Sequence, residues 1–202
     1  MLSKFLLNGY LIIQILCLYS TAFSQPPPTL QCDDCAGSGT LEGPYDVSVD
    51  IDTTVGGCAV KIQYYKRTCK GFTNVFITNY KMSGTNCSGL SDNTKIDRAL
   101  SRMIYDEIVT LPPYGSGDAP AYWRVRRPAC WQKSQITSDT ASYTSCPSAE
   151  CCDTYFKAAV GDCGKNISYI PMKDTTNCPT PTPPMQCFRS CGRDPLDAWH
   201  QD

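Results

Sequence analysis

The chain has 202 residues, a formal net charge of −1 and 42% apolar residues, with 14 cysteines, 15 prolines and a single histidine. This balance excludes a disordered polyelectrolyte, and it excludes a general nucleic-acid binder because such proteins carry a surplus of basic residues. Catalysis by an imidazole base is disfavoured as well, because the one histidine, His200, stands close to the C-terminus.

The first segment, residues 1–24, has the three parts of a secretory signal peptide. Lys4 supplies a positive end, residues 11–18 form an apolar stretch, and Ala22 and Ser24 provide the small residues of a cleavage site. The apolar stretch is too short for a membrane-spanning helix, which needs about 20 residues. We therefore expect a secreted, extracellular protein (periplasmic or at the cell surface in a bacterium) with no membrane span in the mature chain.

The cysteines fit an oxidising compartment. Cys17 leaves with the signal, so the mature chain keeps thirteen cysteines, a density typical of a disulfide framework. Because thirteen is odd, at most six internal disulfides can form, and one cysteine is left free, capped or bonded to another chain. The disulfide candidates are Cys32, Cys35, Cys58, Cys69, Cys87, Cys130, Cys146, Cys151, Cys152, Cys163, Cys178, Cys187 and Cys191.

Chain geometry restricts how these cysteines pair. A strand between Cys58 and Cys69 would hold them about 35 Å apart, whereas a disulfide needs Cα atoms within about 7 Å. These two cysteines should therefore not bond to each other. The adjacent Cys151 and Cys152 should have different partners, because a ring closed by neighbours is strained. The pairs Cys32–Cys35, Cys130–Cys146 and Cys187–Cys191 remain open.

The predicted elements begin with three strands. Residues 46–52 alternate between apolar and polar side chains, which is typical of a half-buried strand. Residues 58–68 and 73–82 follow as a second and a third strand, separated by short glycine-containing turns. Consecutive strands with short turns favour an antiparallel meander.

A helix is predicted next, over residues 94–109, where apolar side chains recur every three or four positions. Thr94 and Asp97 resemble a capping pair at its start, and Pro112 ends it.

The rest of the chain returns to extended structure. Residues 122–127 are predicted as a strand and residues 134–149 as a long polar loop, while 154–160 and 167–171 form a final hairpin. The sequence therefore predicts an α+β fold, with an antiparallel sheet of about five to six strands and one main amphipathic helix. This disulfide-rich domain spans residues 32–173, between a Pro-rich leader at 25–31 and a Pro- and Cys-rich segment at 174–202 that cysteines staple to it.

One acidic motif resembles a catalytic site. Asp50 and Asp52 match the pattern in which haloacid-dehalogenase-like phosphatases carry a nucleophilic aspartate, a proton donor and a Mg²⁺ ion. In that family the motif follows a buried parallel strand, whereas residues 46–52 alternate. The favoured interpretation is therefore a pair of acids on the solvated face of a strand.

Cys32 and Cys35 form a CxxC motif. A redox pair needs a lowered thiol pKa, and the two intervening carboxylates, Asp33 and Asp34, act in the opposite direction. A zinc site would add Cys187 and Cys191 as ligands. Export favours disulfides instead, so we expect no metal and no cofactor.

Aromatic and basic residues alternate further along the chain. Rings beside guanidinium groups can stack on sugars or hold sulfate and carboxylate groups. The candidate ligand-binding residues are Tyr122, Trp123, Arg124, Arg126 and Trp131. The alternation favours a second interpretation, in which Trp123 and Val125 point into the core while Tyr122, Arg124 and Arg126 cover the outside. Asn86 and Asn166 begin sequons for glycosylation.

No complete catalytic set emerges from these motifs. The sequence therefore predicts a secreted, disulfide-stabilised, non-catalytic protein that binds an extracellular protein or a glycan and no nucleic acid. One alternative is a structural subunit of an envelope, matrix or filament, linked into a homo-oligomer through the odd cysteine. The other is a metal-assisted hydrolase centred on Asp50 and Asp52.

Overall fold

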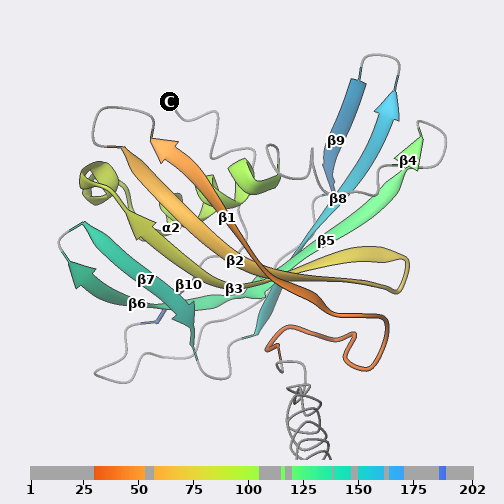
Figure 1. The fold of residues 1–202 in the computed structure, drawn as a ribbon, viewed down its shortest axis with the longest axis horizontal. Helices are drawn as coiled ribbons and strands as arrows, with labels where there is room; N and C mark the ends of the chain where they lie inside the picture. Colours follow the sequence, from red (N-terminus) through yellow and green to blue (C-terminus); the bar gives the residue numbers. More distant parts are fainter. Residues whose placement is uncertain are drawn as a thin grey trace, which may run out of the picture.

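The computed structural model describes residues 30–52, 57–104, 115–116, 120–137, 139–146, 150–161, 164–170 and 187–189. In this part of the chain ten strands form one curled sheet, accompanied by a single α-helix (Figure 1). The fold is therefore mainly β, and the expectation of an α+β fold with five to six strands needs correction.

The elements follow one another along the chain in this order: β1 (Glu42–Asp52), β2 (Cys58–Cys69), β3 (Phe72–Ser83), the 3-10 helix η1 (Thr85–Gly89), α2 (Asp92–Arg102), β4 (Gly115–Ser116), β5 (Ala121–Pro128), β6 (Cys130–Thr137), β7 (Thr140–Ser145), β8 (Cys151–Gly161), β9 (Gly164–Ile170) and β10 (Cys187–Arg189). The predicted meander of three antiparallel strands is confirmed as β1, β2 and β3. The predicted final hairpin is confirmed as β8 and β9.

The sheet branches at β3. One side of β3 pairs along its length with β2, while the other side pairs first with β5, in parallel, and then with β7, antiparallel. Beyond β5 the sheet continues into β8 and β9, and beyond β7 it continues into β6 and β10. Figure 1 shows these two branches diverging from β3. They place two separate surfaces on one molecule.

The core lies between α2 and one face of the sheet. Helix α2 contributes buried apolar side chains, and β1 and β2 contribute the alternating residues that were predicted to face inward. The core includes Val47, Val49, Ile51, Val60, Ile62, Ile96, Leu100, Trp123, Val125 and Trp131.

The helix begins earlier than predicted. Its N-cap is Ser91, whose hydroxyl accepts a hydrogen bond from the Thr94 backbone N–H at 3.2 Å. The expected capping pair is therefore wrong, because Thr94 lies inside the first turn and the Asp97 carboxylate faces Arg127 at 3.6 Å. The α-helix ends at Arg102, and the predicted residues 105–109 lie outside the described residues.

The predicted long loop over residues 134–149 is largely a hairpin of β6 and β7. Almost every residue of β6 beyond Gln132 is exposed, so the sequence carries no alternation between apolar and polar side chains there. Pairing of β7 with β3 supplies the order instead, and it buries Ala141 and Tyr143.

The disulfides include Cys32–Cys151, Cys35–Cys69 and Cys58–Cys87, with Cα atoms 5.7, 6.2 and 4.9 Å apart. The prediction that Cys58 and Cys69 do not bond to each other is confirmed, whereas the open pair Cys32–Cys35 is wrong. Three further cysteines are disulfide-bonded as well, namely Cys130, Cys146 and Cys152. Separate partners for Cys151 and Cys152 are thus confirmed.

An N-terminal segment, residues 30–39, covers part of the second face of the sheet. Two of the disulfides anchor it, one to β8 and one to the end of β2. Leu30, from the expected leader, is already buried, and the Gln31 amide donates to the Cys146 carbonyl at 3.3 Å.

The expected signal peptide and Cys163, Cys178 and Cys191 lie outside the described residues, as does most of the C-terminal segment. No helix in the described ranges is long and apolar enough to cross a membrane.

Candidate functional site

The strand alternation of β5 divides the predicted ligand-binding residues between two faces of the sheet. Trp123 and Trp131 are fully buried in the core, where Trp131 packs edge-on against Tyr80 with ring centroids 4.8 Å apart. Tyr122 lies on the opposite face and is 43% exposed. The five residues therefore do not converge on one site.

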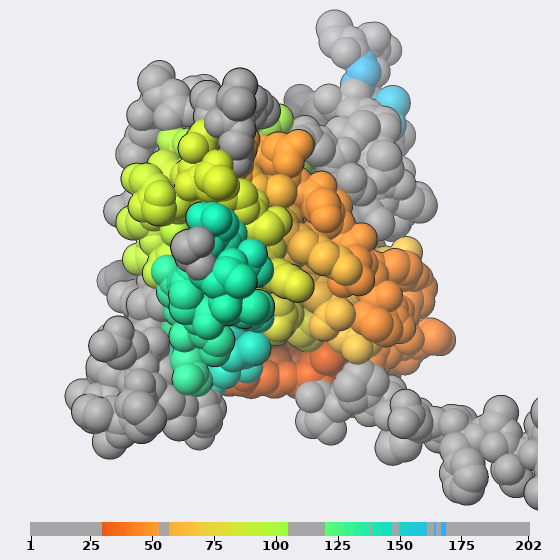
Figure 2. Space-filling view, turned by 60° about the vertical axis from the view of Figure 1, so that its left-hand side comes forward, coloured from red at the N-terminus to blue at the C-terminus, as the bar shows by residue number. Residues whose placement is uncertain are grey.

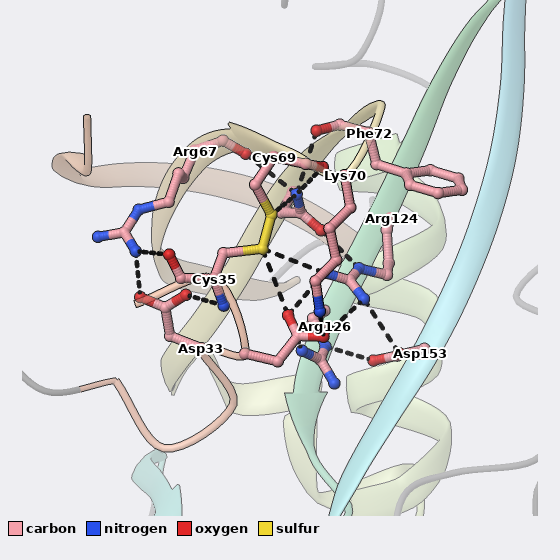
Figure 3. Close-up of a disulfide and its surroundings, with 11 residues drawn as sticks. Asp33, Cys35, Arg67, Cys69, Lys70, Phe72, Arg124, Arg126 and Asp153 are labelled. Carbon is pink, nitrogen blue, oxygen red and sulfur yellow. Dashed lines mark hydrogen bonds and ion pairs between the residues drawn. A yellow bond between two sulfur atoms is a disulfide. The ribbon is translucent and has the colours of Figure 1, made fainter. Parts of the chain in front are cut away.

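Arg124 lies on the same face as Tyr122 but is buried, because the N-terminal segment covers it. Its guanidinium forms a two-pronged ion pair with the Asp34 carboxylate, with N···O distances of 3.1 and 2.8 Å (Figure 3). The Arg124 Nε–H donates to the amide oxygen of Asn74.

Arg126 extends this network across the sheet. Its guanidinium lies 2.5 Å from Asp34 and 2.6 Å from Asp153, and the Lys70 ammonium lies 3.0 Å from Asp34. Burial acts to raise the pKa of Asp34, but the hydrogen bonds from Arg124 and Lys70 outweigh it and hold the pKa well below its usual value of 3.8. Asp34 is therefore ionised at neutral pH, and both arginines already have an anionic partner.

A second ion pair anchors the same segment. The Arg67 guanidinium contacts Asp33 at 2.9 Å and donates to the Cys35 carbonyl at 2.6 Å. Asp34 and the sulfurs of Cys35 and Cys69 lie within 4.8 Å of one another. Because both sulfurs belong to one disulfide, they offer no thiolate to a metal. The CxxC motif thus supplies two disulfides to two different strands.

A groove on the core side of the other branch was missed by sequence reasoning. It has a volume of about 500 Å³ and lies between η1, the start of α2 and the β6–β7 hairpin. Figure 2 shows the hairpin (teal) beside the yellow-green surface of residues 85–104. The lining residues combine a partly apolar floor with a polar rim: Met82, Cys87, Ser88, Leu90, Ser91, Asp92, Lys95, Lys133, Gln135, Asp139, Thr140, Ala141 and Tyr143.

Asp92 is the central charged group of the groove. Its carboxylate accepts a hydrogen bond from the Tyr143 hydroxyl at 2.6 Å and pairs with Lys95 and Lys133, each at 3.2 Å. Burial acts to raise the pKa of Asp92, but these bonds lower it. Burial and the neighbouring carboxylate together raise the pKa of Tyr143, so its hydroxyl keeps its proton.

The walls of the groove are fixed by covalent and close backbone contacts. The Cys58–Cys87 disulfide ties η1 to the start of β2. Gly84, just before η1, has a φ of 131°, and a Cβ placed there would lie 2.2 Å from the Gly57 carbonyl oxygen, so only glycine fits. We regard the groove as preformed. In the sequence, the turn at Gly84 is the one feature that hints at this groove, because the polar sequence of β6 shows no pattern that predicts a strand.

The acidic motif lies at the end of β1. Asp50 is exposed, Asp52 is half-buried, and β1 pairs antiparallel with β2. This is not the parallel-strand setting that the phosphatase pattern requires. His200 lies outside the described residues.

The two sequons lie in different elements. Asn86 is a half-buried residue of η1, and its backbone N–H donates to the Gly57 carbonyl at 3.3 Å. Asn166 lies in β9 and pairs with Ala159 of β8.

Comparison with known proteins adds no identification: no family model, no curated protein and no solved structure matches this chain.

Proposed function

We propose that this protein is a secreted, non-catalytic binding protein whose ligand occupies the groove between α2 and the β6–β7 hairpin. The observation that carries the proposal is the groove itself. Its volume of about 500 Å³ falls in the range of ligand-binding clefts, and a few converging polar groups above an apolar floor are typical of such sites. The disulfides and the signal-like N-terminal sequence support an extracellular location.

The state of Asp92 supports binding over catalysis. A general base works best when its pKa lies near the working pH. The hydrogen bonds from Tyr143 and the two lysines lower the pKa of Asp92 instead. The Asp92 carboxylate is a fixed hydrogen-bond acceptor that orients Tyr143 and the two lysines. It forms part of the rigid polar rim that a ligand in the groove would contact.

Filling the groove tests the proposal. The oxidised mature protein is screened on a glycan array and against a panel of extracellular proteins, and the hits are measured again with Thr140→Trp, which places an indole at the rim. The matched control is Thr144→Trp, an exposed residue of the same strand that does not line the groove. We expect at least one hit whose binding is abolished by Thr140→Trp and retained by Thr144→Trp. Failure to find any ligand with this pattern would contradict the proposal.

A further inference from the structure

A second surface, on the opposite face of the sheet, gathers three aromatic rings from three strands. Phe72 of β3 contacts Tyr122 of β5 and Tyr155 of β8, with ring centroids 6.2 and 5.5 Å apart and planes nearly perpendicular. Tyr122 is 43% exposed, and the other two rings are half-buried. Among described residues, large exposed hydrophobic side chains are otherwise found only at Ile136 and Val160. We call these three rings the aromatic cluster.

The β2–β3 turn that carries Phe72 is fixed by hydrogen bonds and a disulfide. The Asn74 amide nitrogen, which is buried, donates to the carbonyls of Arg67, Cys69 and Phe72 at 3.1 to 3.3 Å. The Cys35–Cys69 disulfide fixes the same turn from the other side. Phe72 is therefore positioned before any partner arrives, and little conformational entropy is lost when a ligand stacks on the rings.

The surroundings of the cluster carry an excess of positive charge. Besides the neutral Arg67–Asp33 pair, four cationic side chains lie around the cluster, Lys70, Arg124, Arg126 and Lys157, against the two carboxylates of Asp34 and Asp153. Lys157 is exposed and pairs across the strands with Tyr122. The Lys70 side chain is 59% exposed. The chain as a whole has a net charge of −1, so the excess is local.

We propose that the aromatic cluster binds an acidic saccharide, with a sugar ring stacked on Tyr122 and a carboxylate or sulfate group held by Lys157. The C–H face of a sugar is apolar and fits an exposed aromatic ring, while its acidic substituent needs a cation beside that ring. Arg124, Arg126 and Lys70 act indirectly, because they pair with Asp34 and Asp153 and leave Lys157 to attract the anion. This site is separate from the groove.

The test is isothermal titration of the mature, oxidised protein with three hexasaccharides of equal length: one built on uronic acids, one sulfated and one neutral. We expect both acidic probes to bind at least tenfold more tightly than the neutral one, and we expect the difference to shrink as salt rises. Tyr122→Ala should weaken binding of the acidic probes at least tenfold, whereas Tyr122→Phe should retain it. Lys157→Gln should weaken binding of the acidic probes and leave the neutral probe unchanged.

Two control variants distinguish the aromatic cluster from the groove and from any exposed apolar side chain. Ile136→Ala removes an exposed apolar side chain on β6, and Thr140→Trp fills the groove; neither should alter the titration. A short polyglutamate serves as a non-saccharide anion. Equal binding of polyglutamate and the acidic saccharides, equal binding of the neutral probe, or no effect of Tyr122→Ala in a folded variant would overturn the proposal.

Discussion

At the scale of single residues, the ion network on the outer face of the sheet depends on the Asn74 amide and on the carboxylates of Asp34 and Asp153. The sequence does not reveal these roles. Asn74 looks like any polar strand residue in the sequence, yet it is fully buried and accepts the Arg124 Nε–H. The alternation rule correctly put Trp123 and Tyr122 on opposite faces. It could not show that Arg124 is covered, because that depends on a segment ninety residues away that reaches Arg124 through Asp34.

Asn74→Ala should lower the free energy of unfolding by about 2–3 kcal/mol, because it leaves several buried carbonyls and one guanidinium without their partner. Chemical denaturation of the oxidised protein measures the change. Asn79→Ala, at a half-buried position on the same strand, is the control and should cost less than about 1 kcal/mol. Equal losses from the two variants would show that the Asn74 bonds do not hold the turn.

The lowered pKa of Asp34 predicts a dependence of stability on acid. Below the usual value of 3.8 the unfolded chain takes up a proton at this carboxyl while the folded chain does not. The stabilisation that Asp34 provides is thus fully present at neutral pH and is lost as the pH falls below that value. Unfolding midpoints of the native protein and Asp34→Asn, measured from pH 7 to pH 2, should differ at neutral pH and converge in acid. A constant difference would contradict the ion network.

At the scale of elements, the sequence predicts a strand or helix correctly where one face is buried, because apolar side chains then recur at a regular spacing. It fails where a strand is held only by hydrogen bonds to its neighbours. The alternation of apolar and polar side chains in residues 46–52 predicts β1, and the apolar side chains that recur every three or four positions after residue 94 predict α2. The β6–β7 hairpin escaped detection because β6 beyond Gln132 is exposed on both faces. The groove was missed with it, since one of its walls is that hairpin.

Ser91→Ala tests the revised start of α2. The Ser91 hydroxyl caps the helix through the Thr94 N–H, so its removal should cost about 1 kcal/mol of unfolding free energy. Ser88→Ala, at an exposed position in η1, should leave stability nearly unchanged, and thermal unfolding of both variants gives the comparison. A helix that begins at Thr94, as the sequence suggests, would make the two substitutions equivalent.

At the scale of the whole molecule, the disulfides join segments that are far apart in the chain. Cys32 and Cys151 are separated by 119 residues and attach the N-terminal segment to β8. The high cysteine content was visible in the sequence. The partners were not, because pairing depends on which strands lie side by side, and β3 next to β5 is a parallel contact that no local pattern predicts.

Removing this long-range bond with Cys32→Ser and Cys151→Ser should lower the free energy of unfolding by about 3–5 kcal/mol, since the closed loop is long. The start of the N-terminal segment should also become looser, which faster proteolysis near residue 30 would report. Unchanged stability in the double variant would mean that the Cys35–Cys69 disulfide and the ion network are enough to retain the segment.

The covalent framework is the claim on which the fold and both proposed binding surfaces depend, and peptide mapping of the non-reduced protein by mass spectrometry tests it most directly. We predict peptides linked as Cys32–Cys151, Cys35–Cys69 and Cys58–Cys87. Cys32 linked to Cys35, or most of these cysteines recovered as free thiols, would contradict the account.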